Sequence, residues 1–183
     1  EMHPEWEYKL WDNDALNQYH KEFGFINEEQ MMQCRNFAEL SDILRCELIY
    51  RYGGVYLDTD FQCLRPTDSF FEKFSDRDLI CSPENSDEYL ATGFFASIPN
   101  HPLLEKLVYG MEERSISHDR ATSCDKYGPL YFTNAIPKEM WIDHKWFYPR
   151  DYSNLYIDGA APNSEELIAS HPEAYGAHMY YGS

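Results

Sequence analysis

The fold is decided between Phe37 and Asp60, where the chain reads FAELSDILRCELIYRYGGVYLDTD. In its first part, apolar side chains recur every three or four residues, which is the spacing of one helix face and predicts a helix over Phe37–Tyr52. Gly53-Gly54 follows at once and supplies the left-handed backbone on which many helices end. Val55–Leu57 is β-branched and aromatic, which predicts a short strand running into the acidic tripeptide that closes the stretch.

The rest of the chain alternates predicted strands with predicted helices. Strands are predicted where β-branched and aromatic residues cluster, and helices where proline opens an apolar stretch. The predicted strands are Glu5–Trp11, Leu79–Cys81, Tyr89–Ala96, Trp146–Tyr148 and His178–Tyr181, and the predicted helices are Glu28–Cys34, Pro102–Met111 and Pro129–Ala135. Such alternation is typical of an α/β protein with a mainly parallel sheet. We expect a single domain over residues 1–183, because no linker or repeat divides the chain.

Composition excludes several classes of protein. The 183 residues include 15 Lys and Arg against 32 Asp and Glu, a formal net charge of −17, so the protein repels nucleic acid and anionic membrane surfaces. No apolar stretch is long enough to span a bilayer. The five cysteines are scattered and form no C-x-x-C pair, which favours buried thiols in a reducing compartment and predicts a cytoplasmic protein.

The chain has three Asp-x-Asp tripeptides, but only Asp58-Thr59-Asp60 comes directly after an apolar strand that follows a glycine-ended helix. In α/β proteins, ligands collect beyond the carboxyl ends of strands. Carboxylates at i and i+2 project to the same side, roughly 6.6 Å apart along the chain. Such a pair suits a hard divalent cation that keeps waters and substrate phosphates. The alternative is a solvated acidic turn, which is common in a chain this acidic.

Asp42 and Arg45 lie three residues apart on the predicted helix, so their side chains share one flank of it. A carboxylate and a guanidinium together offer acceptors and donors to the adjacent hydroxyls of a polyol. The alternative is an intrahelical salt bridge, worth about a few tenths of a kcal/mol at a surface.

With these motifs the chain resembles the glycosyltransferases that carry the DXD sugar-binding motif. That family includes mannosyltransferases, capsular polysaccharide glycosyltransferases of the family 32 type and, more distantly, the clostridial glucosylating toxins. The resemblance rests on Ser41–Arg45 and Tyr50–Asp60, and it extends to Trp6–Asp12, Ser97–Leu103, Gly128-Pro129, Phe147–Pro149 and His178–Ser183. It covers essentially the whole chain, which starts after the family's first strand and stops before its closing tryptophan.

The resemblance implies a GT-A-like nucleotide-sugar-binding fold with a mainly parallel central sheet, lacking the family's first strand because the chain is truncated at its N-terminus. It implies a metal-dependent, retaining hexosyltransferase that moves a sugar from a UDP- or GDP-sugar to a glycan, lipid-linked or protein acceptor, as in polysaccharide biosynthesis. For a eukaryotic relative with its anchor removed, the implied compartment is the Golgi lumen.

The resemblance also implies the residues of the site. The implied donor-binding residues are Asp42, Arg45, Tyr56, Asp58, Thr92 and Ser183, and the implied ligands of Mn²⁺ or Mg²⁺ are Asp58, Asp60 and His178. For His178, the alternative is a partly buried histidine in a terminal strand. The ion would neutralise the charge that develops on a departing diphosphate. No protein nucleophile is implied, because in this chemistry the departing phosphate can accept the acceptor's proton.

A different class of function is a catalytically weakened module that binds carbohydrate or nucleotide-sugar. Aromatic residues make up 16% of the chain and could stack on sugar faces. A glycoside hydrolase is less suited, because it needs two carboxyl groups flanking the scissile bond, whereas a close Asp-x-Asp beside an Asp/Arg pair favours a cation and a donor. Metal-independent binding of free glycan would favour the module.

Overall fold

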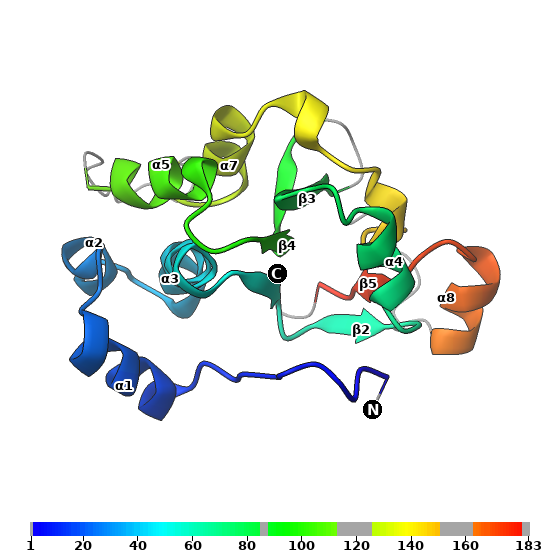
Figure 1. Ribbon diagram of the computed structural model, residues 1–183, viewed down its shortest axis with the longest axis horizontal. Coiled ribbons are helices and arrows are strands. Elements are labelled where there is room, and N and C mark those ends of the chain that lie inside the picture. The colour runs from blue at the N-terminus through cyan, green and yellow to red at the C-terminus, as the bar shows by residue number, and fades with distance from the viewer. Residues whose placement is uncertain (1, 85–87, 113–125, 151–162, 181–183) are drawn as a thin grey trace.

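The computed structural model describes residues 2–84, 88–112, 126–150 and 163–180, in which helices pack around two small sheets (Figure 1). The helices are α1 (Asn13–Phe23), α2 (Glu28–Met32), α3 (Phe37–Tyr52), α4 (Asp68–Lys73), α5 (Pro102–Gly110), α7 (Pro129–Ala135) and α8 (Ser164–Ser170), with 3₁₀ turns η1 (Lys138–Met140) and η2 (His144–Trp146). The strands are β1 (Gly54–Leu57), β2 (Phe61–Cys63), β3 (Leu79–Pro83), β4 (Leu90–Ser97) and β5 (Gly176–His178).

The helix and strand that decide the fold form where the sequence predicts them. The side chain of Asn36 accepts a hydrogen bond from the Glu39 N–H and begins α3. Gly53 ends the helix with a φ of 67°, and its N–H donates to the Ile49 carbonyl. A Cβ on Gly53 would lie only 2.7 Å from Cδ of Pro99. Both the backbone angle and the close packing therefore require glycine at this position.

The three-stranded sheet is antiparallel, which corrects the prediction of a mainly parallel one. Its order is β1-β4-β3, and Phe95 of β4 faces Tyr56 on one side and Cys81 on the other. In the described ranges, the one parallel contact is an isolated bridge between Cys81 and Trp141. Only residues 84–89 separate β3 from β4, too few for the dozen or more that a parallel crossover needs. Alternation along the sequence therefore did not reveal which strands become neighbours.

Most other predicted elements are present with shifted ends. α2, α5, α7, β3 and β4 match their predicted ranges within two residues, whereas β5 ends at His178, where a strand was predicted to begin. The predicted strand over Trp146–Tyr148 is wrong, because Trp146 closes the η2 turn and the Tyr148 N–H donates to the His144 carbonyl. The predictions also omitted α1, α4, α8 and β2.

The predicted strand over Glu5–Trp11 is wrong as well, since this segment pairs with no strand in the described ranges. It runs as an extended arm along one side of the molecule (Figure 1). Trp6 holds this arm against α4: its indole N–H donates to Asp68 at 3.1 Å, and its ring packs against Phe71. Asp12, the residue after the predicted strand, begins α1 by accepting from the Ala15 N–H.

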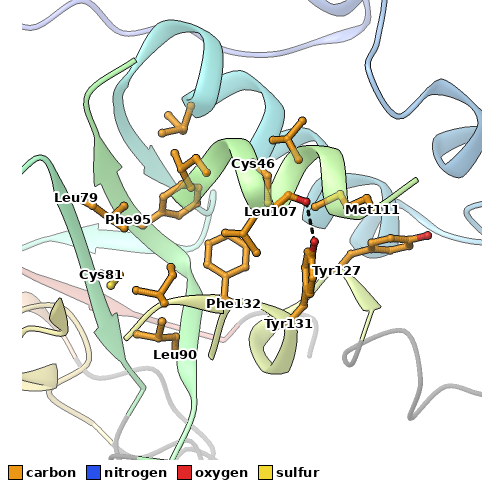
Figure 2. Close-up of a cluster of buried hydrophobic side chains, with 14 of the residues drawn as sticks. Cys46, Leu79, Cys81, Leu90, Phe95, Leu107, Met111, Tyr127, Tyr131 and Phe132 are labelled. Carbon is orange, nitrogen blue, oxygen red and sulfur yellow. Dashed lines mark hydrogen bonds between the residues drawn. The ribbon is translucent and has the colours of Figure 1, made fainter. Parts of the chain in front are cut away.

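Strand β4 is buried on both faces and separates two apolar clusters. On one face, Phe95 packs with side chains of α3, α5 and α7, and the Tyr131 hydroxyl donates to the Leu107 carbonyl there at 2.8 Å (Figure 2). On the other face, Phe94 stacks on Phe147 with ring centroids 3.6 Å apart. Because both faces are packed, β4 holds its neighbours at fixed positions.

The described cysteines agree in part with the expectation of buried thiols. Cys46 and Cys81 are buried, Cys34 is half-buried and Cys63 is exposed, and all four are free thiols. Among the helices in the described ranges, none has the length and apolar character that crossing a membrane requires.

Candidate functional site

The acidic tripeptide lies in the turn between β1 and β2, where backbone hydrogen bonds hold it from two sides. The Asp58 N–H donates to the Gly93 carbonyl of β4 at 2.9 Å. The Asp60 carbonyl accepts from the Met179 N–H at 3.0 Å, just after β5. Strand β2, which follows the turn, pairs antiparallel with the C-terminal strand β5, and Phe61 lies opposite His178. The fold therefore brings the C-terminal strand beside both aspartates.

Three potential metal ligands converge at this turn. Nε2 of His178 lies 3.0 Å from Oδ1 of Asp60 and 3.7 Å from Oδ2 of Asp58. One ligand atom from each of the three residues lies within 4.8 Å of the others. The side chains are 13% exposed at His178, 17% at Asp60 and 27% at Asp58, so solvent reaches the cluster. Two carboxylates and an imidazole suit a divalent cation, and no second such group occurs in the described ranges.

Arg45 connects the predicted sugar-binding pair to the acidic turn. Its guanidinium is nearly buried, and Nη1 donates to the Thr92 carbonyl at 2.8 Å and to the Thr92 hydroxyl at 3.2 Å. Nε and Nη2 donate to the carbonyl and hydroxyl of Ser41. Two carboxylates complete the network, because Nη2 lies 3.3 Å from Oδ1 of Asp42 and Nη1 lies 3.3 Å from Oδ1 of Asp58.

Tyr56 binds the same oxygen of Asp58 as Arg45 does. Its hydroxyl donates to Oδ1 of Asp58 at 2.7 Å, and its ring lies 4.8 Å from the guanidinium carbon of Arg45. Oδ1 therefore has one neutral donor and one nearby cation, while Oδ2 faces His178 at the longer distance of 3.7 Å.

The two carboxylates beside Arg45 have opposite pKa shifts. Burial raises the pKa of Asp42 to about 6, although the nearby Arg45 opposes this shift. For Asp58, burial also favours the neutral acid, but its contacts with His178, Arg45 and Tyr56 outweigh burial and lower the pKa. Asp58 is thus ionised at neutral pH, as a cation ligand must be.

The structure brings together every predicted site residue that it describes. Asp42, Arg45, Tyr56, Asp58 and Thr92 form one contact network, and Asp58, Asp60 and His178 form the acidic cluster. Ser183 lies outside the described residues. The hydroxyl of Thr92 serves Arg45, so its visible role is to hold the guanidinium.

Sequence reasoning missed Ser41, Gly93 and Tyr148. Ser41 stands four residues before Arg45, so helical spacing could have paired the two. A Cβ on Gly93 would lie 2.7 Å from Oδ2 of Asp58, and a glycine inside a strand is the usual signal of such a close approach. Tyr148 is 2% exposed and lies beside this glycine. It is far from Asp58 in the sequence, so no helix or strand spacing could have linked the two residues.

The chain is similar in sequence to known glycosyltransferases. Residues 1–76 match the family described as the glycosyltransferase sugar-binding region containing the DXD motif. The inositol phosphoceramide mannosyltransferase 1 of Schizosaccharomyces pombe is 24% identical over 176 residues, which are 89% of this chain and 50% of that protein. The human alpha-1,4-N-acetylglucosaminyltransferase is 25% identical over 115 residues, 62% of this chain and 30% of that protein.

An uncharacterized glycosyltransferase of Acanthamoeba polyphaga mimivirus is 24% identical over 192 aligned positions, which cover 96% of this chain and 69% of that protein. The chain spans half the length of the yeast relative and less than half that of the human one. Motif, site geometry and relatives agree: the chain is similar to the glycosyltransferases whose sugar-binding region contains the DXD motif, and the family match covers residues 1–76.

Proposed function

We propose that the protein is a metal-dependent, retaining glycosyltransferase that moves a sugar from a UDP- or GDP-sugar to a hydroxyl acceptor. The match of residues 1–76 to the family with the DXD sugar-binding motif and the glycosyltransferase names of the relatives support the reaction class. The observation that carries the proposal is the convergence of Asp58, Asp60 and His178 at the end of β1. Because the chain spans half of the mannosyltransferase relative, the activity of the whole protein is part of this proposal.

Asp58, Asp60 and His178 are the proposed ligands of Mn²⁺ or Mg²⁺. When bound, the ion supplies a Lewis acid that stabilises the negative charge on the departing nucleoside diphosphate. The chain itself carries a formal net charge of −17, so a cation would also offset the repulsion of an anionic donor. The lowered pKa of Asp58 supports this role, because the carboxylate needs no deprotonation before it binds.

Asp42 and Arg45 are the proposed binding residues for the donor sugar. The side chain of Asp42 is 19% exposed and that of Arg45 is 6% exposed, which leaves the carboxylate as the more accessible group. Arg45 would hold Asp42 and Asp58 in place, and Asp42 would accept hydrogen bonds from sugar hydroxyls. Tyr56 and Thr92 would complete the donor site, because Tyr56 contacts Asp58 and Thr92 contacts Arg45. For Ser183, the support is the family resemblance alone.

A glycan, lipid-linked or protein hydroxyl is the proposed acceptor class, in line with the glycosyltransferase names of the relatives. We further propose that residues 1–183 form one domain with a GT-A-like fold. For the compartment we propose the cytoplasm, with the Golgi lumen as the alternative for a eukaryotic protein. No protein nucleophile is part of the proposal, since the departing phosphate can take the proton of the acceptor hydroxyl.

Calorimetric titration with UDP- and GDP-sugars, with and without Mn²⁺, tests the proposal. We expect one nucleotide-sugar to bind only with the metal, and Asp60→Asn to weaken that binding at least about tenfold. Asp76→Asn is the matched control, because Asp76 belongs to another Asp-x-Asp tripeptide and is exposed. Equal binding by the Asp60 variant would contradict the cation site. Binding of free glycan without metal would instead support a carbohydrate-binding module.

A further inference from the structure

A buried tyrosine hydroxyl lies beside the proposed cation site. Tyr148 is 2% exposed, and its Oη has no hydrogen-bond partner in the part of the chain that the structure describes. The ring is fixed edge-on against Phe61 with centroids 5.5 Å apart, and it lies 5.8 Å from the His178 ring. An unpaired buried hydroxyl costs free energy. A hydroxyl kept at this cost is expected to have an acceptor in the working protein.

Gly93 bounds the space between this hydroxyl and Asp58. A Cβ on Gly93 would lie 2.7 Å from Oδ2 of Asp58 and 3.2 Å from Oη of Tyr148. Both oxygens therefore face the same small volume, and a side chain at position 93 would fill it. The Gly93 carbonyl also accepts the Asp58 N–H at 2.9 Å, so β4 fixes the backbone of Asp58 next to that volume.

The hydroxyl is a donor with a proton to give. Burial raises the pKa of Tyr148 well above its ordinary value, and the nearby Asp58 and Glu84 add to the effect. The backbone N–H of Phe94 lies near the same oxygen but makes no regular hydrogen bond with it. Among the atoms that line the space at Gly93, the nearest acceptor with negative charge is Oδ2 of Asp58.

We propose that Tyr148 is a positioning residue for the cation site: when the cation is bound, the Tyr148 hydroxyl donates a hydrogen bond to Oδ2 of Asp58 across the space that Gly93 keeps open. This inference rests on the proposed function. Oδ1 of Asp58 is already held by Tyr56 at 2.7 Å and by Arg45 at 3.3 Å, whereas Oδ2 meets only the looser 3.7 Å contact with His178 among the described ion pairs.

A neutral donor on Oδ2 has an advantage over a charged one. Formed together with the cation contacts, its hydrogen bond holds the carboxylate in the orientation that the ligand set needs. It does not compete with the cation for the charge of Asp58, as a lysine or arginine would. Tyr148 thus gives Oδ2 a neutral hydroxyl donor, as Tyr56 does for Oδ1.

Titration of the metal-free protein with Mn²⁺ alone, followed by calorimetry, tests this role. Tyr148→Phe keeps the ring and removes the hydroxyl, and we expect Mn²⁺ affinity to fall about tenfold. The melting temperature without metal should stay the same or rise, because an unpaired buried hydroxyl is removed. Tyr131→Phe is the matched control, since this buried hydroxyl donates to the Leu107 carbonyl in the other apolar cluster. It should lower the melting temperature and leave Mn²⁺ affinity unchanged.

Gly93→Ala provides a second, independent variant. A methyl group there would separate the two oxygens, so a folded Gly93→Ala protein should lose Mn²⁺ affinity as Tyr148→Phe does. If Gly93→Ala does not fold, Tyr148→Phe decides alone. Wild-type Mn²⁺ affinity in Tyr148→Phe would overturn the positioning role while leaving the cation site intact. Failure of the wild-type protein to bind Mn²⁺ would overturn the cation site, and this inference with it.

Discussion

The two oxygens of the Asp58 carboxylate are held in different ways. Oδ1 accepts from Tyr56 at 2.7 Å and lies 3.3 Å from Arg45, and both partners come from α3 and β1, which are adjacent in sequence. We call Asp42, Arg45, Tyr56 and Thr92 the Arg45 side. Oδ2 faces His178 at 3.7 Å, a residue that reaches the site from β5. We call Asp60 and His178 the His178 side.

The difference suggests separate roles for the two sides: the Arg45 side supports the fold of the site, and the His178 side binds the cation. On the Arg45 side, the guanidinium has backbone, hydroxyl and carboxylate partners at once, so this side is rigid before any ligand arrives. On the His178 side, Nδ1 of the imidazole has no hydrogen-bond partner in the described ranges. Stability should therefore depend on the Arg45 side, and cation affinity on the His178 side.

The largest expected effect is the loss of Arg45. Arg45→Met leaves Asp42 and Asp58 close together without a cation, and we expect the free energy of unfolding to fall by about 3–5 kcal/mol. Urea denaturation at pH 7 measures it. Lys145→Met is the control, because its ion pair with Asp143 is exposed and should contribute at most about 1 kcal/mol. Similar small losses for both variants would show that the Arg45 side is not the rigid scaffold.

Removal of the Tyr56 hydroxyl should have a smaller effect on the same side. Tyr56→Phe deletes a hydrogen bond to an ionised carboxylate, and we expect a loss of about 1.5–3 kcal/mol in the free energy of unfolding at pH 7. Tyr50→Phe is the control, since the Tyr50 hydroxyl lies 3.4 Å from Glu105 in an exposed contact. If the two variants have equal stability, the 2.7 Å contact does not contribute as proposed.

The His178 side should respond in affinity rather than in stability. His178→Gln removes one of three proposed ligands, and we expect Mn²⁺ affinity to fall at least about tenfold. Its ion pairs are partly exposed, so the metal-free protein should lose less than about 1 kcal/mol. Calorimetry and denaturation on the same samples measure both quantities. His20→Gln is the control, and a large stability loss with unchanged Mn²⁺ affinity would reverse the assignment of the two sides.

The smallest effect concerns the pH dependence of stability through Asp42. Its pKa is raised from 3.8 to about 6 in the folded protein, so the folded state binds the proton more tightly than the unfolded state. The resulting stabilisation is complete below pH 3.8 and is lost as the pH rises through about 6. Asp42→Asn removes this dependence, so its stability relative to the wild type should be higher at pH 7 than at pH 4.5.

Denaturation curves at several values of pH measure that difference. Asp14→Asn is the control, because Asp14 is exposed in the first turn of α1. A stability difference for Asp42→Asn that stays constant between pH 4.5 and 7 would mean that Asp42 does not titrate in this range.

The parts of the fold that could be predicted are those set by neighbouring residues. The helix over Phe37–Tyr52, its glycine end and the strand after it depend on local spacing and backbone freedom, and all three are confirmed. The direction of the sheet depends on which strands meet, and the short connection between β3 and β4 excludes a parallel arrangement of that pair. Trp146–Tyr148 looked like a strand because it is aromatic, but Trp146 ends a 3₁₀ turn, and the rings of Phe147 and Tyr148 pack in the core directly after it.

The site divides in the same way. Asp42 with Arg45 and Asp58 with Asp60 could be found from spacing, whereas His178 was named only through the family resemblance, because nothing local ties it to residues in the first third of the chain. Tyr148 escaped prediction because an unpaired hydroxyl is visible only once its surroundings are known.

The pairing of β2 with β5 has a consequence for the lifetime of the protein. A cation held by Asp60 and His178 would act as a reversible cross-link that closes the chain between residues 60 and 178. Ligands that bind only the folded state also slow every process that starts from the open one. The supply of metal and donor would then govern both catalysis and resistance to cellular proteases, so that a starved enzyme is also the one degraded first.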